Sequence, residues 1–184
     1  MTLEDLAREA LAARESAWAP FSGFKVGAAV LTEEGLVYRG CNVESAAYPL
    51  TNCAERVAIQ KAVSEGHPRV VAVAVAADAS YLRRGEGGGA GPMAAADGPG
   101  RAGRGAAVTG GALERFVTPC GACRQVIYEF GPDAVVVLAD LEGGRHLTSA
   151  RELLPGGFRL EVAAEVRGGR REARDGRQEV GSGD

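Results

Sequence analysis

The chain has 184 residues, enough for one sizeable core, and a formal net charge of -3. Its charges are mixed along the sequence without a basic stripe, which argues against a nucleic-acid surface and favours a small neutral partner. No apolar run is long enough to cross a bilayer, and no charged-then-apolar leader follows Met1, so we expect a soluble cytoplasmic protein that does not bind membranes. Four cysteines are too few for a disulfide scaffold and favour metal ligands or catalytic thiols.

The N-terminal part of the sequence predicts a helix followed by a hairpin. Apolar residues recur at helical spacing over 3–18 and predict a first helix, which Pro20 ends. Thr2 has the character of a capping residue at its start. The segments 25–32 and 36–41 then predict two strands joined by a short turn that contains glycine.

A second helix and a buried strand follow. Residues 53–66 carry apolar positions at helical spacing, with Thr51 or Asn52 as the expected cap. Residues 70–77 form a continuous apolar run of strand length, which is typical of a strand covered on both faces. We therefore expect helices on each side of the sheet.

The composition changes sharply over 80–111, and the part from Gly85 to Gly111 is rich in glycine and almost free of large apolar residues. Such a segment buries too little surface to offset its ordering entropy, so it predicts a disordered insertion; the alternative is a functional lid. The polar, glycine-rich stretch 167–184 predicts a disordered tail. The expected organisation is one domain over 1–166, interrupted by this insertion.

The remaining segments complete an α/β pattern. A helix is expected after Pro119, then a buried strand at 134–140, a short strand near His146 and a last helix at 149–154. Strands that alternate with helices around one sheet predict a three-layer α/β/α domain, with a mixed sheet of about five strands.

Three cysteines stand at predicted helix starts. Pro119 marks the beginning of a helix, so Cys120 falls in its first turn and Cys123 lies on the same face. Cys53 begins the helix predicted over 53–66. Helix N-termini lower the pKa of thiols and favour thiolates. Three thiolates suit zinc and leave a fourth position for water, which is the arrangement of a catalytic zinc site.

The other candidate ligands fit less well. Cys41 ends a predicted strand without a CxxC partner, and we expect it to be a small buried hydrophobe. The alternative is that Cys41 closes a four-cysteine structural zinc site in a non-enzymatic binding module. His67 and His146 have no ligand spacing to the cysteines.

Charged residues next to the cysteines are candidates for supporting chemistry. Glu55 lies two positions after Cys53, where a carboxylate can take a proton from water and pass it to a leaving group. The alternative is a first-turn glutamate that complements the helix dipole. Arg56 or Arg124 could donate hydrogen bonds to a ligand sulfur, or could be solvated helix arginines.

These motifs carry a family resemblance. Cys-Ala-Glu in NCAERVAI, followed by Pro-Cys-Gly-Ala-Cys in TPCGACRQV, resembles the signature of zinc-dependent nucleoside and nucleobase deaminases, in the variant with three cysteines. The stretches APFSGFKVGAAV and GCNVESAAYPLTNCAER are similar to the small homotetrameric cytidine deaminases. The resemblance covers roughly Leu3 to Phe158 apart from the insertion. It implies a cytidine-deaminase-like sandwich, one zinc ion per subunit, a homotetramer, and hydrolytic deamination of cytidine and 2'-deoxycytidine in pyrimidine salvage.

The resemblance also assigns roles to individual residues. It implies three zinc ligands, Cys53, Cys120 and Cys123, with Glu55 as the proton shuttle; of the two arginines, Arg56 is the one we expect to support a sulfur. It implies substrate contacts from Phe24, which would stack on the pyrimidine, from Asn42 and Glu44, which would bind the ribose hydroxyls, and from Ala54. It implies that a neighbouring subunit completes each pocket with Ala46, Tyr48 and Phe158.

Some of these substrate assignments depend on the motif context. Taken alone, Phe24 is typical of a core aromatic, and Asn42 and Glu44 are typical of loop polar residues. An alternative substrate is another aminopyrimidine nucleoside such as blasticidin S, or a base in a polynucleotide. Asn42 and Glu44 favour a free ribose, and the absence of a basic groove disfavours nucleic acid.

Overall fold

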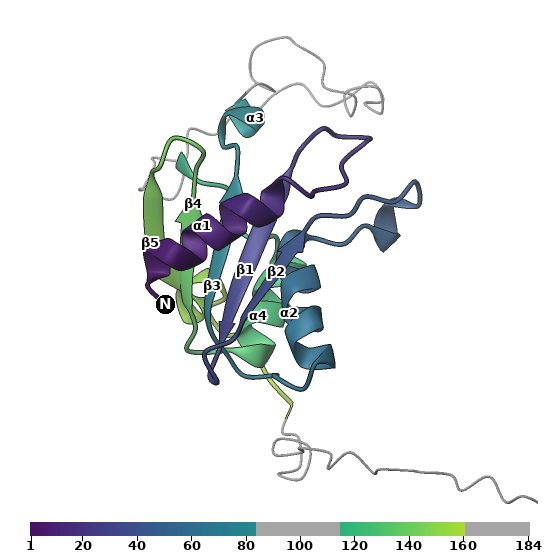
Figure 1. Ribbon diagram of the computed structural model, residues 1–184. Helices are drawn as coiled ribbons and strands as arrows, with labels where there is room; N and C mark the ends of the chain where they lie inside the picture. The colour runs from purple at the N-terminus through teal and green to yellow at the C-terminus, as the bar shows by residue number, and fades with distance from the viewer. Residues whose placement is uncertain (84–114, 161–184) are drawn as a thin grey trace, which may run out of the picture.

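The computed structural model describes residues 1–83 and 115–160 (Figure 1). Its helices are α1 (Leu3–Arg14), the 3-10 turn η1 (Tyr48–Leu50), α2 (Ala54–Ser64), α3 (Ser80–Arg83), α4 (Gly121–Phe130) and α5 (Ala150–Leu153). Its strands are β1 (Val26–Thr32), β2 (Val37–Cys41), β3 (Val70–Ala77), β4 (Val135–Ala139) and β5 (Arg145–Ser149). The strands predicted over 25–32, 36–41, 70–77 and 134–140 are all present, with ends that agree to within one residue.

Within the described ranges the five strands form one mixed sheet, in the order β2-β1-β3-β4-β5. β1 runs antiparallel to both of its neighbours, β3 and β4 run parallel, and β5 returns antiparallel to β4. The parallel pair requires a crossover, which is the part of the chain that contains α4. The predicted mixed sheet of five strands is confirmed.

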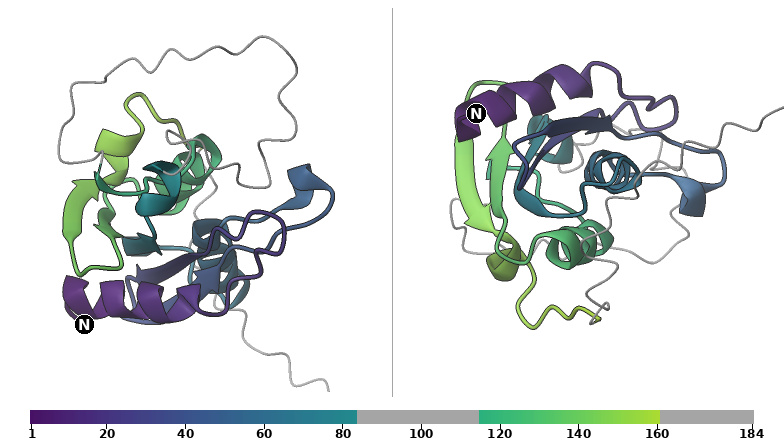
Figure 2. Two further views of the ribbon diagram at one scale, coloured as in Figure 1. Left: turned by 90° about the horizontal axis from the view of Figure 1, so that it is seen from above. Right: turned by 60° about the horizontal axis from the view of Figure 1, so that its bottom comes forward.

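Helices cover both faces of the sheet, so the domain has the predicted three layers (Figures 1 and 2). Alternate residues of β3 serve the two cores. Ala72, Ala74 and Ala76 pack with α1 on one face, whereas Val73 and Val75 pack with α2 and α4 on the other. The small side chains on the first face allow α1 to lie close to the sheet.

Glycine is required where a helix backbone meets a strand. A Cβ placed on Gly27 would clash with the carbonyl oxygen of Ala10 in α1. A Cβ on Gly40 would lie 2.5 Å from the carbonyl oxygen of Ala54, in the first turn of α2. Any other residue at Gly40 would push the start of α2 away from the sheet.

The elements that form the candidate site meet at one end of the strands of the sheet. The pairs Val26 with Ala77 and Gly27 with Cys41 bring the start of β1 next to the ends of β3 and β2. The close approach of Gly40 to α2 places the start of that helix at the same end of the strands. The candidate site lies at this end of the strands.

The first helix is shorter than the sequence predicted, because it ends at Arg14. Trp18 instead lies beside the segment that follows β2: its N–H donates to the carbonyl of Asn42 at 3.0 Å, and its carbonyl accepts from the N–H of Glu44 at 2.8 Å. Trp18 and Val43 thus form an isolated parallel bridge, and the Trp18 side chain is 62% exposed. These backbone bonds outweigh the helical spacing of the apolar residues.

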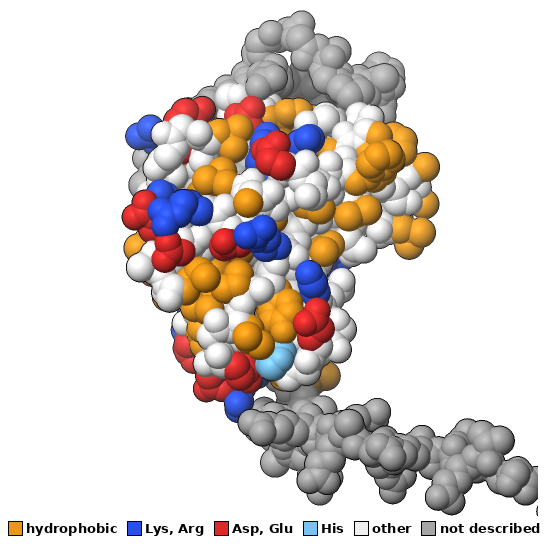
Figure 3. All heavy atoms as spheres, in the orientation of Figure 1, with side chains coloured by type: hydrophobic (Ala, Val, Ile, Leu, Met, Phe, Trp, Pro, Cys, Tyr) orange, Lys and Arg blue, Asp and Glu red, His pale blue; other side chains and the backbone are white. Residues whose placement is uncertain are grey.

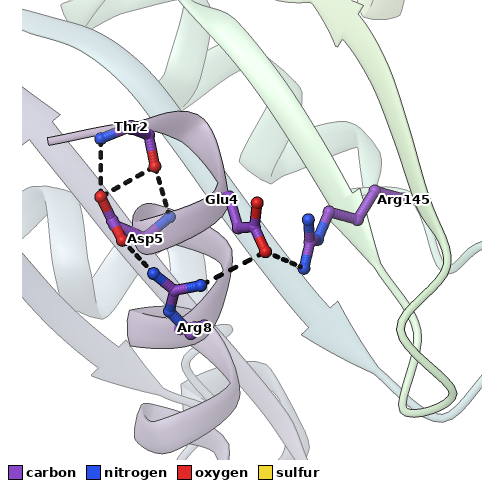
Figure 4. A network of polar contacts seen from close by, with 5 residues as sticks. All are labelled: Thr2, Glu4, Asp5, Arg8 and Arg145. Atoms are coloured by element: carbon purple, nitrogen blue, oxygen red, sulfur yellow. Dashed lines mark hydrogen bonds and ion pairs between the residues drawn. The ribbon is translucent and has the colours of Figure 1, made fainter.

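Polar contacts fix the start of α1 (Figure 4). The predicted cap is confirmed as a capping box: the Asp5 N–H donates to the Thr2 hydroxyl, and the Thr2 N–H donates to the Asp5 carboxylate. Arg8 bonds to both Asp5 and Glu4, and Arg145 of β5 also donates to Glu4 at 3.2 Å. This network joins the helix to the edge strand.

Two predictions on chain organisation fall on residues outside the described ones. The described chain continues as α3 up to Arg83, which is inside the segment predicted as an insertion over 80–111. The rest of that segment and the predicted tail at 167–184 lie outside the described residues. Among the described helices, none combines the length and the apolar character that a membrane crossing requires.

Candidate active site

The structure brings three of the four cysteines together. The Sγ atoms of Cys53, Cys120 and Cys123 all lie within 4.8 Å of one another, and those of Cys53 and Cys120 are 3.9 Å apart. Zinc–sulfur bonds of about 2.3 Å at tetrahedral angles place two sulfurs about 3.8 Å apart. Cys123 is buried, Cys53 is half-buried and Cys120 is exposed. The donor set and its spacing fit a zinc ion that is approached from the side of Cys120.

Two of these cysteines take the place of helix caps. Cys53 is the N-cap of α2 and Cys120 is the N-cap of α4, and neither side chain makes a capping hydrogen bond. The predicted cap of α2 at Thr51 or Asn52 is therefore wrong. Serine or aspartate at such a position stabilises a helix by about 1 kcal/mol. Two helices that lack this stabilisation at the same place indicate that the sulfurs serve another purpose.

The thiols influence one another electrostatically. A hydrogen bond with Cys123 is the largest of the effects that lower the pKa of Cys53, to about 5, and Arg56 adds to them. The pKa of Cys123 is raised, first by its hydrogen bond with Cys53 and then by burial. A negative charge is thus stabilised on Cys53, at the N-terminus of α2, where the helix dipole also favours an anion.

The two candidate arginines differ in what they contact. Arg56 lies close enough to Cys53 to lower its pKa, and donates to the carbonyl of Thr51 at 2.6 Å. Its Nε is buried and has no hydrogen-bond partner among the described residues, as expected of a donor reserved for the sulfur site. Arg124 donates to the carbonyl oxygens of Pro119 and Leu153, so it fixes the approach to α4.

Cys41 lies apart from the three-cysteine group. Its thiol donates to the carbonyl oxygen of Ser16 at 3.3 Å, and it is half-buried. Within the described residues, the group of possible metal ligands contains the other three cysteines without Cys41, His67 or His146. Instead, Nδ1 of His67 lies 3.5 Å from Oε2 of Glu34, and the ring of His146 lies beside the ring of Phe116, with 5.9 Å between the ring centroids. This geometry does not support a closed site of four cysteines.

Glu55 lies in the first turn of α2, directly beside the cluster, and is 4% exposed. Its pKa is raised to about 7: burial is the largest cause and the neighbouring Cys53 charge acts in the same direction, whereas a backbone hydrogen bond, the Cys123 thiol and Arg56 act to lower the pKa. A carboxyl group with a pKa near neutrality both accepts and donates a proton readily at physiological pH. A solvated first-turn glutamate would not be buried in this way.

The segment Phe21–Val26, which leads into β1 and includes its first residue, carries Phe24 and is called the substrate loop below after the predicted role of that residue. Glu44 holds its first part: the carboxylate accepts from the N–H of Phe21 at 2.8 Å, from the N–H of Ser22 at 3.2 Å and from the Ser22 hydroxyl. Burial alone would raise the pKa of Glu44, but these hydrogen bonds outweigh it and the pKa is lowered. The carboxylate is therefore charged and fixed.

Asn42 holds the second part of the substrate loop. Its amide is buried, accepts from the N–H of Val26 at 2.8 Å and donates to the carbonyl of Phe24 at 2.8 Å. Asn42 and Glu44 thus stand on one side of the loop that carries Phe24. The structure places all three predicted substrate residues together at the edge of the sheet where α2 begins, and Ala54 is the first residue of that helix.

The sequence did not single out Tyr81, which also contacts the substrate loop. Its ring lies 4.6 Å from that of Phe24 between centroids, and its hydroxyl donates to the carbonyl of Ser22 at 2.8 Å. Tyr81 belongs to α3, at the beginning of the segment predicted as an insertion. The one available signal was an aromatic residue four positions before the glycine-rich run that begins at Gly85.

The residues predicted to serve a neighbouring subunit are exposed. Tyr48 is 59% exposed, Phe158 is 68% exposed, and Ala46 is also exposed. Gln125 of α4 donates to the carbonyl of Phe158 at 3.0 Å and so fixes the backbone that presents this ring.

Comparison with known proteins decides the family. Residues 1–139 match the family model of the cytidine and deoxycytidylate deaminase zinc-binding region. A cytidine deaminase of Halalkalibacterium halodurans is 42% identical over 162 residues, which cover 88% of this chain and 97% of the relative. The chain belongs to the cytidine and deoxycytidylate deaminase family. The resemblance noted in the motifs is confirmed.

Solved structures of cytidine deaminases share the fold. The crystal structure of cytidine deaminase from Burkholderia pseudomallei superposes with a TM-score of 0.64 and 39% identity, over 86% of this chain and all of the other. A blasticidin-S deaminase of Bacillus cereus is more distant, at 29% identity over 130 residues, 71% of this chain and 74% of the relative. The zinc-binding region that defines the deaminase family includes all three clustered cysteines.

Proposed function

We propose that this protein is a zinc-dependent hydrolase that converts cytidine and 2'-deoxycytidine to the corresponding uridines with release of ammonia. The observation that carries the proposal is the cluster of Cys53, Cys120 and Cys123 with the buried carboxyl group of Glu55 beside it. The similarity to cytidine deaminases over most of the chain supports the same reaction.

The chemistry divides between the cluster and Glu55. Zinc held by the three sulfurs supplies Lewis acidity, which lowers the pKa of water and makes it a nucleophile near neutral pH. Glu55 accepts a proton from the attacking water and donates it to N3 of the pyrimidine. It then transfers the second proton of that water to the departing amino group. One water is consumed, the bond from C4 to oxygen forms, the bond from C4 to nitrogen breaks, and ammonia leaves.

The substrate loop orients the nucleoside. Phe24 presents an aromatic face for the flat base, and Glu44 and Asn42 lie on one side of it with carboxylate and amide groups that suit ribose hydroxyls. Both polar side chains also hold the loop backbone. We therefore assign them two tasks: they fix Phe24, and their remaining lone pairs bind the sugar.

Arg56 has a supporting role in this proposal. Three thiolates around a divalent ion leave a net negative charge, which weakens the acidification of water. The guanidinium of Arg56, whose buried Nε has no hydrogen-bond partner in the described part of the chain, offsets that charge at Cys53.

We further propose that the protein acts as a homotetramer in which neighbours complete each pocket. Figure 3 shows apolar side chains gathered on the projection that contains η1. The large apolar residues exposed in that region are Trp18, Phe21, Val43, Tyr48 and Leu50. Such a patch is typical of a surface that another chain covers. Ala46, Tyr48 and Phe158 are exposed, as their assignment to a neighbouring pocket requires.

The cellular setting and the chain organisation complete the proposal. We assign the protein to the cytoplasm and to pyrimidine salvage, because its reaction recovers uracil nucleosides from cytosine nucleosides. We also propose that residues 1–166 form one deaminase domain, with an insertion at about 80–111 and a separate tail at 167–184.

A substrate comparison tests this function. The loss of ultraviolet absorbance on deamination is measured for cytidine, 2'-deoxycytidine, blasticidin S and a cytosine-containing oligonucleotide, at equal concentration, with zinc-loaded protein. We expect turnover of the first two substrates and little of the others. Preferred turnover of blasticidin S would replace the proposed substrate with the alternative one, while inactivity toward all four would reject the enzymatic function.

The role of Glu55 is tested by Glu55→Gln, which keeps the shape but cannot shuttle protons. The rate constant kcat should fall by about a hundredfold to ten-thousandfold while the zinc content remains at one per chain. Glu65→Gln, at the opposite end of α2, is the matched control and should retain full activity. Substantial deamination by the Glu55 variant would exclude the assigned role.

A further inference from the structure

Phe24 and Tyr81 form an aromatic pair that joins two distant parts of the chain. Their ring centroids are 4.6 Å apart, with an angle of 32° between the ring planes, which lies within the range of favourable aromatic contacts. The Tyr81 hydroxyl donates to the Ser22 carbonyl at 2.8 Å, two residues before the partner ring. Tyr81 therefore contacts both the side chain and the backbone of the substrate loop.

The substrate loop is thus held from two sides of β1. Asn42 and Glu44 follow β2, which pairs with one edge of β1, and they bind the loop through hydrogen bonds. Tyr81 follows β3, which pairs with the other edge. The polar side chains on the β2 side fix the loop backbone, whereas Tyr81 packs against the Phe24 ring itself.

We propose that Tyr81 is a positioning residue for base recognition, which fixes the Phe24 ring in the orientation that receives the pyrimidine. This inference rests on the proposed function and assigns to the reaction a residue outside the deaminase motifs. A Phe24 ring without this contact could rotate between rotamers, and binding of the base would then have to select one of them. Loss of a single fixed orientation of the Phe24 ring should weaken the binding of substrate and of product alike, and it should leave the rate of the chemical step unchanged.

Steady-state kinetics of Tyr81→Ala, Tyr81→Phe and the wild-type enzyme test the proposal. For Tyr81→Ala we expect the KM for cytidine to rise about tenfold, with kcat within about twofold of wild type. Tyr81→Phe retains the ring and loses one hydrogen bond, so its KM should rise about threefold at most. The Kd for the product uridine, measured by titration, should change in the same proportions, and zinc should stay at one per chain.

Tyr128→Phe is the matched control, because its hydroxyl contacts Arg151 at 3.5 Å near α5, away from the substrate loop. It should leave KM and kcat unchanged. If Tyr81→Ala does not fold, Tyr81→Leu takes its place, since it keeps the apolar bulk and removes the aromatic face. The expected result is then a KM above that of Tyr81→Phe and a normal kcat; a KM equal to that of the wild type would overturn the proposal.

The opposite outcomes are equally definite. An unchanged KM in a folded, zinc-loaded Tyr81→Ala would overturn the proposal, and so would a fall in kcat at constant KM. A lower KM would also overturn it, because Tyr81 would then cover the ring face that the base needs. A wild-type enzyme that does not deaminate cytidine would instead reject the proposed function, so the two failures are distinguishable.

Discussion

The three-cysteine centre and the substrate loop lie at the same end of the strands of the sheet, but different kinds of structure fix their positions. Two short motifs supply the centre: Cys53 begins α2, and Cys120 and Cys123 begin α4. The substrate loop instead depends on Asn42 and Glu44 after β2 and on Tyr81 after β3. The three-cysteine centre therefore depends on where two helices begin, whereas the contacts of the substrate loop depend on strand pairing.

Removal of one cysteine tests most strongly whether the centre and the loop are independent. Cys120→Ser should lose zinc and lower cytidine turnover by at least about a thousandfold, because two sulfurs do not hold the ion. Cys41→Ser is the matched control, since Cys41 bonds to Ser16 outside the cluster. It should retain both metal and rate, as measured by metal analysis and ultraviolet assay. Loss of zinc from the Cys41 variant would instead favour a structural site.

The position of α2 provides the next test. Gly40→Ala should lower the free energy of unfolding by about 3 kcal/mol, because the added Cβ would lie 2.5 Å from the Ala54 carbonyl oxygen. Gly121→Ala is the matched control, since a Cβ there meets nothing within 4 Å, and it should change stability by less than about 0.5 kcal/mol. Equal stabilities in urea denaturation would show that α2 does not lie so close to β2.

A change in the substrate loop sharpens the contrast with the centre. Asn42→Ala leaves the Val26 N–H and the Phe24 carbonyl without their partner, so stability should fall by about 2 kcal/mol. The KM for cytidine should rise while the zinc content remains at one per chain. Zinc loss in this folded variant would mean that loop and centre are not separately held, contrary to the comparison.

The smallest effect is expected far from both regions. Thr2→Ala removes the capping box of α1 and should lower the free energy of unfolding by about 1 kcal/mol, measured by thermal or urea denaturation. KM, kcat and zinc content should not change. Any change in KM would indicate that α1 is coupled to the substrate loop.

The sequence predicted most of the sheet and the grouping of three cysteines because both have local signals. The apolar run of β3 is long enough to define a buried strand, and Pro-Cys-Gly-Ala-Cys places two sulfurs on one helix face. The end of α1 was mispredicted because Trp18 continues the helical spacing while its backbone bonds to a segment 24 or more positions later. Local periodicity contains no information about such a competing bridge.

Other features depend on contacts that a sequence does not display. The cap of α2 was assigned to Thr51 or Asn52 from their usual preference, whereas the structure has Cys53 at that position, with its sulfur in the three-cysteine group. Tyr81 was overlooked because the change in composition set the predicted boundary at 80, whereas its contact with Phe24 follows from the pairing of β1 with β3.

Zinc K-edge X-ray absorption of the purified, zinc-loaded protein tests the central claim most directly. The account predicts three sulfur neighbours at about 2.3 Å and one oxygen or nitrogen neighbour at about 2.0 Å. Four sulfur neighbours would contradict it, because no position would then remain for the water that attacks the base.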